Sequence, residues 1–263
     1  GILIINPDNP TGAVYPEHIL RDIVKIAEKN DLFIICDEVY QNMVYNGTKS
    51  VPLATIIGDK VPAISMRGVS KEMPWPGGRC GWIEVYNGHN DPMFEKYINS
   101  ILNAKMVEVC STTLPQLVLP QIKSHPKYQD YLHERIARYE KYSNIAYDIL
   151  KDVKGVLVNR TNGAFYMSAA FEQGLLNNKQ SLPIQNDEVR KTVEAMVSGP
   201  GVSPDKRFVY YLLGSTGVCV VPLSSFATSL QGFRITLLER NEQEFIKIFT
   251  TIAAAVKEYI SSD

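Results

Sequence analysis

The chain has 263 residues, of which 45% are hydrophobic and 21% charged, and its formal net charge is −1 at pH 7. This composition is typical of a globular protein with a sizeable core, and it excludes collagen, a coiled coil and global disorder. The 27 basic and 28 acidic residues leave no surplus of positive charge for nucleic acid or an anionic membrane. Because one domain usually takes about 100–200 residues, we expect two domains.

The four cysteines stand at positions 36, 80, 110 and 219. These spacings match neither a CxxC metal pair nor a dense disulfide framework, so we expect no metal site and a reducing, cytoplasmic compartment. No apolar stretch approaches the roughly 18–20 residues that a membrane span needs, and the first residues do not resemble a signal peptide. We therefore expect no membrane insertion.

The first half of the chain alternates apolar runs with helical and turn patterns. An apolar stripe after Pro16 predicts a helix between the first two runs. Continuous apolar runs at this spacing indicate βαβ units and strands buried on both faces of a parallel sheet. The predicted strands are Gly1–Ile5, Leu32–Cys36, Val61–Met66 and Cys80–Tyr86.

The second half has a mixed pattern that predicts a smaller α+β domain. Gly174–Asp205, with three prolines, is expected to be a loop or insertion. The sequence thus indicates two domains, residues 1–134 and 135–263. The elements expected in the second are helices over His133–Val153, Phe208–Leu213 and Asn241–Ser261, and strands over Gly155–Asn159, Ala164–Phe171, Val218–Val221 and Phe233–Leu238.

Polar side chains follow three successive predicted strands. Asn9 follows the first, Asp37 and Tyr40 the second, and Ser70 and Lys71 the third. Because ligands of open α/β sheets bind at the carboxyl ends of the strands, we expect these groups to converge. A lysine amine, a carboxylate, an amide and a phenol suit pyridoxal 5′-phosphate (PLP), whose aldehyde bonds to an amine and whose ring nitrogen pairs with a carboxylate.

Four segments in order resemble the class I/II aminotransferases of PLP fold type I. They read NPDNPTG at 6–12, DEVY at 37–40, SK at 70–71 and PGGRCGW at 76–82, and the resemblance continues to Arg234. It implies a large domain with a mostly parallel sheet flanked by helices, followed by a small α+β domain. The form GVSK at 68–71, with Gly68 where many members carry Ser or Thr, is similar to alanine-type aminotransferases.

The resemblance also implies a role for each matching residue. Lys71 would be the Schiff-base lysine and move the proton, while Asp37 would pair with the ring nitrogen. The further cofactor contacts would come from Asn9 and Tyr40 at the ring oxygen and from Ser70 and Arg79 at the phosphate, and the substrate contacts from Arg234 at the α-carboxylate together with Asn9. Each also has an ordinary structural explanation: Asp37 and Asn9 suit turns, and Arg234 suits an ion pair.

The resemblance implies a PLP enzyme that moves an amino group between an amino acid and a 2-oxo acid by a ping-pong mechanism, as a homodimer when full length. It covers only the later part of family members, so we expect a truncated chain that lacks the N-terminal phosphate loop and the ring-stacking aromatic. Two alternatives stay open: a PLP-dependent lyase of the same fold type, and a non-catalytic PLP-fold fragment. The motif's usual Pro-Gly before the substrate arginine is Pro222-Leu223 here, which leaves the shape of the substrate pocket open.

Overall fold

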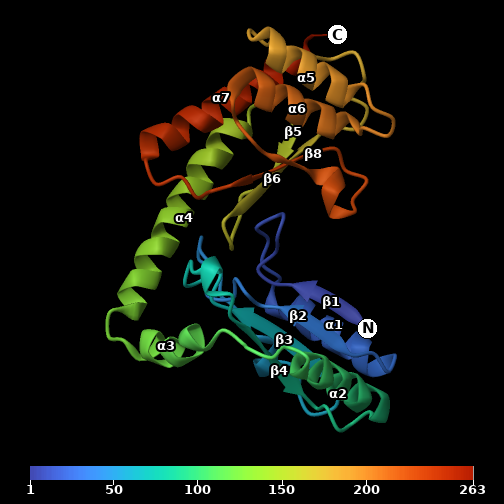
Figure 1. Cartoon of the computed structure of the whole chain (residues 1–263), viewed down its shortest axis with the longest axis vertical. Helices are drawn as coiled ribbons and strands as arrows, with labels where there is room; N and C mark the ends of the chain where they lie inside the picture. The colour runs from blue at the N-terminus through green and yellow to red at the C-terminus, as the bar shows by residue number, and fades with distance from the viewer. Residues whose placement is uncertain (263) are drawn as a thin grey trace. The chain divides into compact units, whose positions relative to one another are not determined.

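The computed structural model describes residues 1–262 and divides into two compact units. The first unit comprises residues 1–9, 13–137 and 162–164, and the second comprises residues 10–12, 138–161 and 165 onwards. Each unit has its own sheet and is described separately below (Figure 1).

The sheet of the first unit has four strands in the order β1-β2-β3-β4. Strands β1 (Ile2–Ile5), β2 (Ile34–Asp37) and β3 (Ala63–Gly68) are parallel, whereas β4 (Gly81–Tyr86) runs antiparallel to β3. The reversal agrees with the connection, because residues 69–80 contain only the short 3-10 turn Pro76–Gly78 and no crossover helix. The predicted mostly parallel sheet is confirmed, with one antiparallel edge strand.

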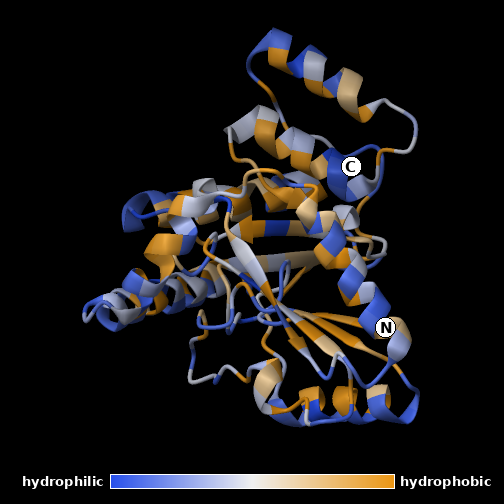
Figure 2. Ribbon diagram, turned by 60° about the horizontal axis from the view of Figure 1, so that its bottom comes forward, coloured by the Kyte–Doolittle hydropathy of each residue, from blue (hydrophilic) through white to orange (hydrophobic). Residues whose placement is uncertain are grey.

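Helix α1 (Glu17–Lys29) covers one face of this sheet. Its buried residues Leu20 and Ala27 pack in the same core cluster as Ile4, Ile34 and Cys36 of the strands. The helix follows Pro16, whose fixed φ and missing N–H suit a helix start. Figure 2 shows strands of this sheet largely in the hydrophobic colour and helices that carry both hydrophilic and hydrophobic residues.

Two further helices follow β4 in the first unit, α2 (Pro92–Met106) and α3 (Thr113–Ser124). The Asp91 side chain caps α2 by accepting hydrogen bonds from the backbone N–H groups of Met93 and Phe94 at 2.6 and 2.8 Å. Short 3-10 turns occupy Leu53–Thr55 and Pro76–Gly78. Helix α4 (Tyr128–Leu150) contributes its first turns to the first unit and the remainder to the second.

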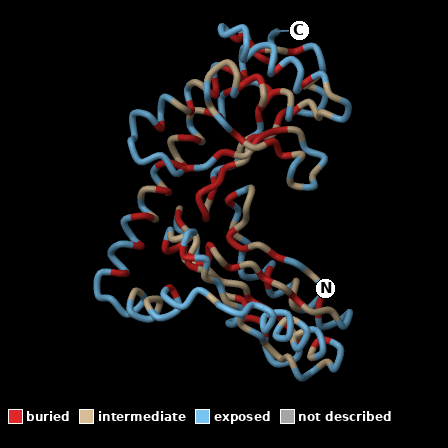
Figure 3. The backbone as a smooth tube through the Cα atoms, viewed as in Figure 1, coloured by how far each residue is buried: buried red, intermediate tan, exposed pale blue. Residues whose placement is uncertain are grey.

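The second unit holds an antiparallel sheet in the order β5-β6-β8-β7. Helices pack with it around an aromatic core, in which the fully buried Phe208 lies 5.2 Å from Phe171, 5.4 Å from Phe233 and 5.1 Å from Tyr259 between ring centroids. Figure 3 shows buried residues on the strands and exposed ones on the outer helix faces. The strands are β5 (Val156–Val158), β6 (Tyr166–Phe171), β7 (Val221–Pro222) and β8 (Gly232–Thr236), and the helices are α5 (Asp187–Val197), α6 (Pro204–Thr216) and α7 (Glu242–Ile260).

One predicted loop is wrong. Residues 174–205 contain helix α5, which begins after Asn186. The Asn186 side chain accepts hydrogen bonds from the N–H groups of Glu188 and Val189 at 2.9 and 3.1 Å, and Val193 and Val197 form the buried face. An Asn cap followed by two acidic residues is a helix-start signal, and the prolines on either side of this helix obscured it.

Candidate active site

The carboxyl ends of β1, β2 and β3 form one rim of the first sheet. Backbone hydrogen bonds extend the pairing to this rim, from Asn6 N to Asp37 O at 3.0 Å and from Glu38 N to Met66 O at 2.9 Å. Beyond β3, Val69 N donates to Cys80 O at 3.1 Å. The residues that follow the three strands are therefore held in a fixed order along the rim.

A cavity of about 490 Å³ opens at this rim. It brings together all the predicted site residues of the first unit, although they come from four separate segments of the chain. Its lining includes Asn9, Asp37, Tyr40, Ser70, Lys71 and Arg79, together with Arg67 and the backbone around Gly68 and Gly81. The sequence-based expectation that these six side chains converge agrees with the geometry.

Lys71 and Tyr40 lie next to each other in this cavity. The Lys71 Nζ atom is 5.8 Å from the centroid of the Tyr40 ring, and Tyr40 itself is buried. Asp37 ends β2, and its Oδ1 atom accepts a hydrogen bond from Val39 N at 3.1 Å. This bond fixes the Asp37 carboxylate at the start of the turn that carries Tyr40.

A residue of α4 forms hydrogen bonds with the backbone next to and at Lys71. Arg135, which is buried, donates from Nη1 to the carbonyl oxygens of Lys71, at 3.3 Å, and of Glu72. The buried Glu72 carboxylate accepts hydrogen bonds from Asn42 Nδ2 at 2.9 Å and from the Tyr128 hydroxyl. Burial, together with the Glu72 carboxylate, raises the pKa of Tyr128, so its hydroxyl stays a donor.

The far wall of the cavity is the turn between β3 and β4. Arg79 is exposed there, with a left-handed backbone (φ 47°) and Nη1 donating to Pro76 O at 2.9 Å. Gly68 and Gly81 face each other across the strand pair. A Cβ atom at Gly81 would lie 3.0 Å from Arg67 O, and one at Gly68 would lie 3.2 Å from Cys80 O. This close approach gives a structural reason for glycine at 68.

Arg234 belongs to the second unit, on β8. Its guanidinium carbon lies 4.6 Å from the centroid of the Tyr166 ring and 5.2 Å from that of Phe226. Phe226 is carried by the short turn Leu223–Phe226, which starts directly after Pro222. Tyr166 is buried, so the ring that lies near the guanidinium belongs to the core.

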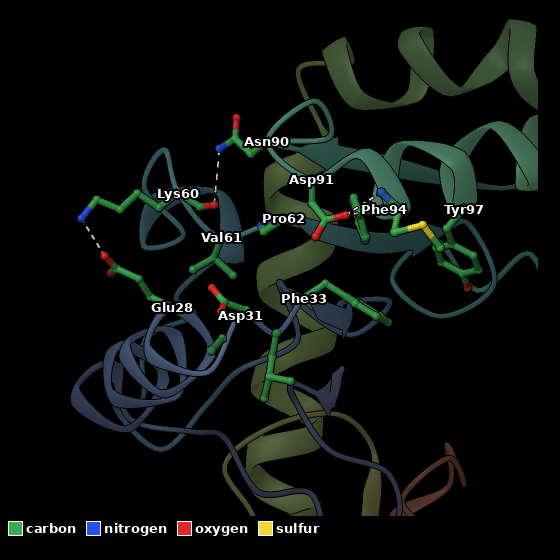
Figure 4. A pocket seen from close by; sticks show the side chains of 13 residues that line it. Glu28, Asp31, Phe33, Lys60, Val61, Pro62, Asn90, Asp91, Phe94 and Tyr97 are labelled. Atoms are coloured by element: carbon green, nitrogen blue, oxygen red, sulfur yellow. Dashed lines mark hydrogen bonds and ion pairs between the residues drawn. The ribbon is translucent and has the colours of Figure 1, made fainter.

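A second cavity, of about 410 Å³, lies at the opposite, amino-terminal edge of the first sheet (Figure 4). Its walls include the Glu28–Lys60 ion pair, at 2.6 Å, and the neighbouring rings of Phe33 and Phe94. None of the sequence-predicted site residues lines it. The chemistry expected from the sequence therefore concentrates at the other rim.

Within residues 1–262, no group of three or more His, Cys, Asp or Glu side chains is arranged to hold a metal ion. Over the same residues, all helices are too short or too polar to cross a membrane. The four cysteines are free thiols.

Sequence reasoning missed the residues that support the rim. Glu38, Arg67, Glu72 and Arg135 are charged and wholly or largely buried, yet their residue types alone do not distinguish them from surface charges. Only Glu38 and Glu72 carried a positional signal, because each directly follows a predicted site residue.

Comparison with known proteins assigns the family. The model of the class I and II aminotransferases matches residues 1–247, so the chain belongs to this family. An uncharacterized aminotransferase of Methanocaldococcus jannaschii is 54% identical over 262 residues, covering 100% of this chain and 60% of the relative. This chain thus spans about 60% of the length of that relative.

Solved structures agree in fold. An alanine aminotransferase from Pyrococcus furiosus matches 96% of this chain and 57% of its own, with a TM-score of 0.74 and 26% identity. An aminotransferase from Escherichia coli matches 99% of this chain and 57% of its own, with a TM-score of 0.78, and at 23% identity it supports the fold alone. The predicted PLP fold type I is confirmed.

Proposed function

We propose that the protein is a PLP-dependent aminotransferase that moves an amino group between an amino acid and a 2-oxo acid. One observation carries the proposal: Asn9, Asp37, Tyr40, Ser70, Lys71 and Arg79 line a single cavity at the carboxyl rim of a parallel sheet. Family membership supports the reaction class. The names of the M. jannaschii and P. furiosus relatives, which are aminotransferases, point the same way.

The donor set fits PLP group by group. The aldehyde requires an amine, which Lys71 supplies, and the ring nitrogen requires a carboxylate, which Asp37 supplies. The ring oxygen suits the Asn9 amide and the Tyr40 phenol, and the phosphate suits the Ser70 hydroxyl and a forked Arg79 guanidinium. When bound, PLP supplies an aldehyde that bonds to amines and a protonated ring that accepts an electron pair from the α-carbon.

The chain's own residues then position groups and move one proton. Asp37 would keep a proton on the ring nitrogen through its negative charge. The Lys71 Nζ atom would accept the proton that leaves the substrate α-carbon and would pass it to the cofactor carbon. We assign the substrate α-carboxylate to Arg234, because a guanidinium binds a carboxylate through two parallel N–H donors, and to Asn9.

Three wider features belong to the same proposal. Residues 1–134 would be the later part of the cofactor-binding domain and 135–263 the small domain, in keeping with the two compact units. The enzyme would act as a homodimer, as the family resemblance implies. It would work in the cytoplasm, where four free thiols stay reduced.

Borohydride trapping tests the proposal. The protein is incubated with PLP, reduced, digested and searched for pyridoxyl-lysine by mass spectrometry. We expect one adduct, on Lys71, and none in K71A. Lys123 provides the matched control, because its Nζ atom lies 5.8 Å from the Trp82 ring just as that of Lys71 lies 5.8 Å from Tyr40. K123A should label like the wild type, and scattered labelling of surface lysines in the wild type would refute the proposed site.

Product analysis tests the reaction type. With alanine, glutamate or tyrosine as donor, the aminotransferase releases a 2-oxo acid only in step with amination of a second 2-oxo acid. With serine or cysteine, which carry a leaving group on the β-carbon, release of ammonia and pyruvate without an acceptor would identify the lyase instead. K71A should lose the activity, and transamination that survives in K71A would exclude the assigned role.

A further inference from the structure

A buried carboxylate lies directly behind the rim. Glu38, only 3% exposed, follows Asp37 in the sequence. Its Oε1 atom accepts a hydrogen bond from Leu53 N at 2.7 Å, and its Oε2 atom accepts one from the Ser65 hydroxyl. Burying a carboxylate is costly unless the group is hydrogen-bonded and paired with a cation.

That cation is Arg67, which lines the cavity and whose side chain is 18% exposed. Its Nη2 atom lies 3.2 Å from Glu38 Oε2, and its Nη1 atom donates to Gln41 Oε1. Its Nε atom forms an ion pair with Glu84 Oε1 on β4, at 3.2 Å. One guanidinium therefore joins three elements: the end of β2, the turn after it, and β4.

The surroundings of Glu84 favour the ionised form of its carboxylate. Although burial raises the pKa of its carboxyl, hydrogen bonds from Tyr86, at 2.6 Å, and Trp82, at 3.2 Å, together with the charge of Arg67, bring the pKa below its ordinary value. Glu84 thus stays ionised opposite Arg67 near neutral pH.

Residues that line the cavity and residues that bind Arg67 are direct neighbours in the sequence. Asp37 and Tyr40 line the cavity, whereas their immediate successors Glu38 and Gln41 bind Arg67. Arg67 itself stands four residues before Lys71, at the end of the strand that leads to it. The side chain therefore ties the segment that carries the carboxylate and phenol to the segment that carries the amine.

From this geometry we propose that Arg67 is a positioning residue of the cavity, fixing the Asp37–Tyr40 turn relative to Lys71. The inference rests on the proposed PLP site. Because Nη1 and Nη2 of Arg67 donate hydrogen bonds to Gln41 and Glu38, and Nε lies within ion-pair distance of Glu84 without hydrogen-bonding to it, the residue acts through its neighbours rather than on the substrate. A planar fork meets the two acceptors on Glu38 and Gln41 in fixed directions, which a lysine ammonium cannot do.

The test compares R67M and R67K with the wild type in three measurements: the PLP dissociation constant, the site of borohydride labelling, and the pH at which the absorption band of bound PLP changes. R67M should weaken PLP binding at least about tenfold, or about 1.4 kcal/mol, and spread the label from Lys71 to surface lysines. R67K keeps the charge but not the fork, so it should weaken binding at least about threefold and shift the pH midpoint of the band. Should R67M fail to fold, R67K decides alone.

The control is R21M, which removes an exposed arginine from a surface ion pair with Glu17, at 2.6 Å. It should leave all three measurements unchanged. If R67K and R67M lower only the melting temperature while PLP affinity, labelling and the pH midpoint match R21M, Arg67 is merely structural and the inference is wrong. A wild type that does not label Lys71 would instead refute the proposed function, so the two failures are distinguishable.

Discussion

The Asp205 carboxylate accepts hydrogen bonds from the short turn Leu223–Phe226, whose Phe226 ring lies near Arg234. Replacing Asp205 by asparagine should destabilise the second unit. Asp205 is 0% exposed at the start of α6. Its Oδ1 atom accepts from the Ser203 and Ser224 hydroxyls at 2.5 and 2.8 Å and from Lys206 N at 2.8 Å. Its Oδ2 atom accepts from Ser224 N at 2.9 Å and from Gly232 N at 3.5 Å.

The magnitude follows from these contacts. An asparagine that keeps the contacts of Oδ1 places its NH₂ group against the N–H groups of Ser224 and Gly232. A buried N–H without an acceptor costs about 1–3 kcal/mol, and the longer Gly232 contact counts for less. With the lost charge at a helix N-terminus added, D205N should lower the free energy of unfolding by about 3 kcal/mol.

Urea unfolding followed by circular dichroism measures this change. Both tryptophans, Trp75 and Trp82, belong to the first unit, so their fluorescence reports that unit separately. The matched control is D187N, in the first turn of α5, where the carboxylate is 73% exposed and paired with Arg190 at 2.7 Å. It should change stability by at most about 0.5 kcal/mol. A free energy of unfolding for D205N within about 1 kcal/mol of that for D187N would refute the reasoning.

Three other substitutions test the packing, the backbone and the pH dependence of the second unit. F208A removes a fully buried ring that contacts three others and should cost about 3–5 kcal/mol in the same urea experiment; a loss under about 1 kcal/mol would mean that this core is not tightly packed. A227G should stabilise the protein by about 0.5–1 kcal/mol, because Ala227 has φ 55° where glycine has no steric cost, and a lower midpoint would contradict this. Burial raises the pKa of Tyr259 from 10.0 to about 12, so the folded state holds a proton that the unfolded state releases. Stability from this group is therefore complete below pH 10 and is lost as the pH rises toward 12, and Y259F should flatten that decline; equal slopes for both proteins would exclude the mechanism.

The sequence by itself determined the strands, their order in the chain and the reactive residues after them. Continuous apolar runs end at Ile5, Cys36 and Met66, and a parallel sheet brings such ends to one edge whatever the connections between them. The convergence of Asn9, Asp37 and Lys71 therefore followed from local pattern and topology alone. Helix α5 was within reach as well, through the cap at Asn186.

Only the tertiary structure decided what holds that edge in place. Arg67 meets Glu38, Gln41 and Glu84 across 17 to 29 positions of sequence, and Arg135 reaches Lys71 from 64 positions away. A local sequence window cannot distinguish these buried charges from solvated ones, because the ionic partner that makes burial tolerable is supplied by another element. The groups that do the chemistry are marked by where strands end, whereas the groups that position them are defined by contacts that form only when the chain folds.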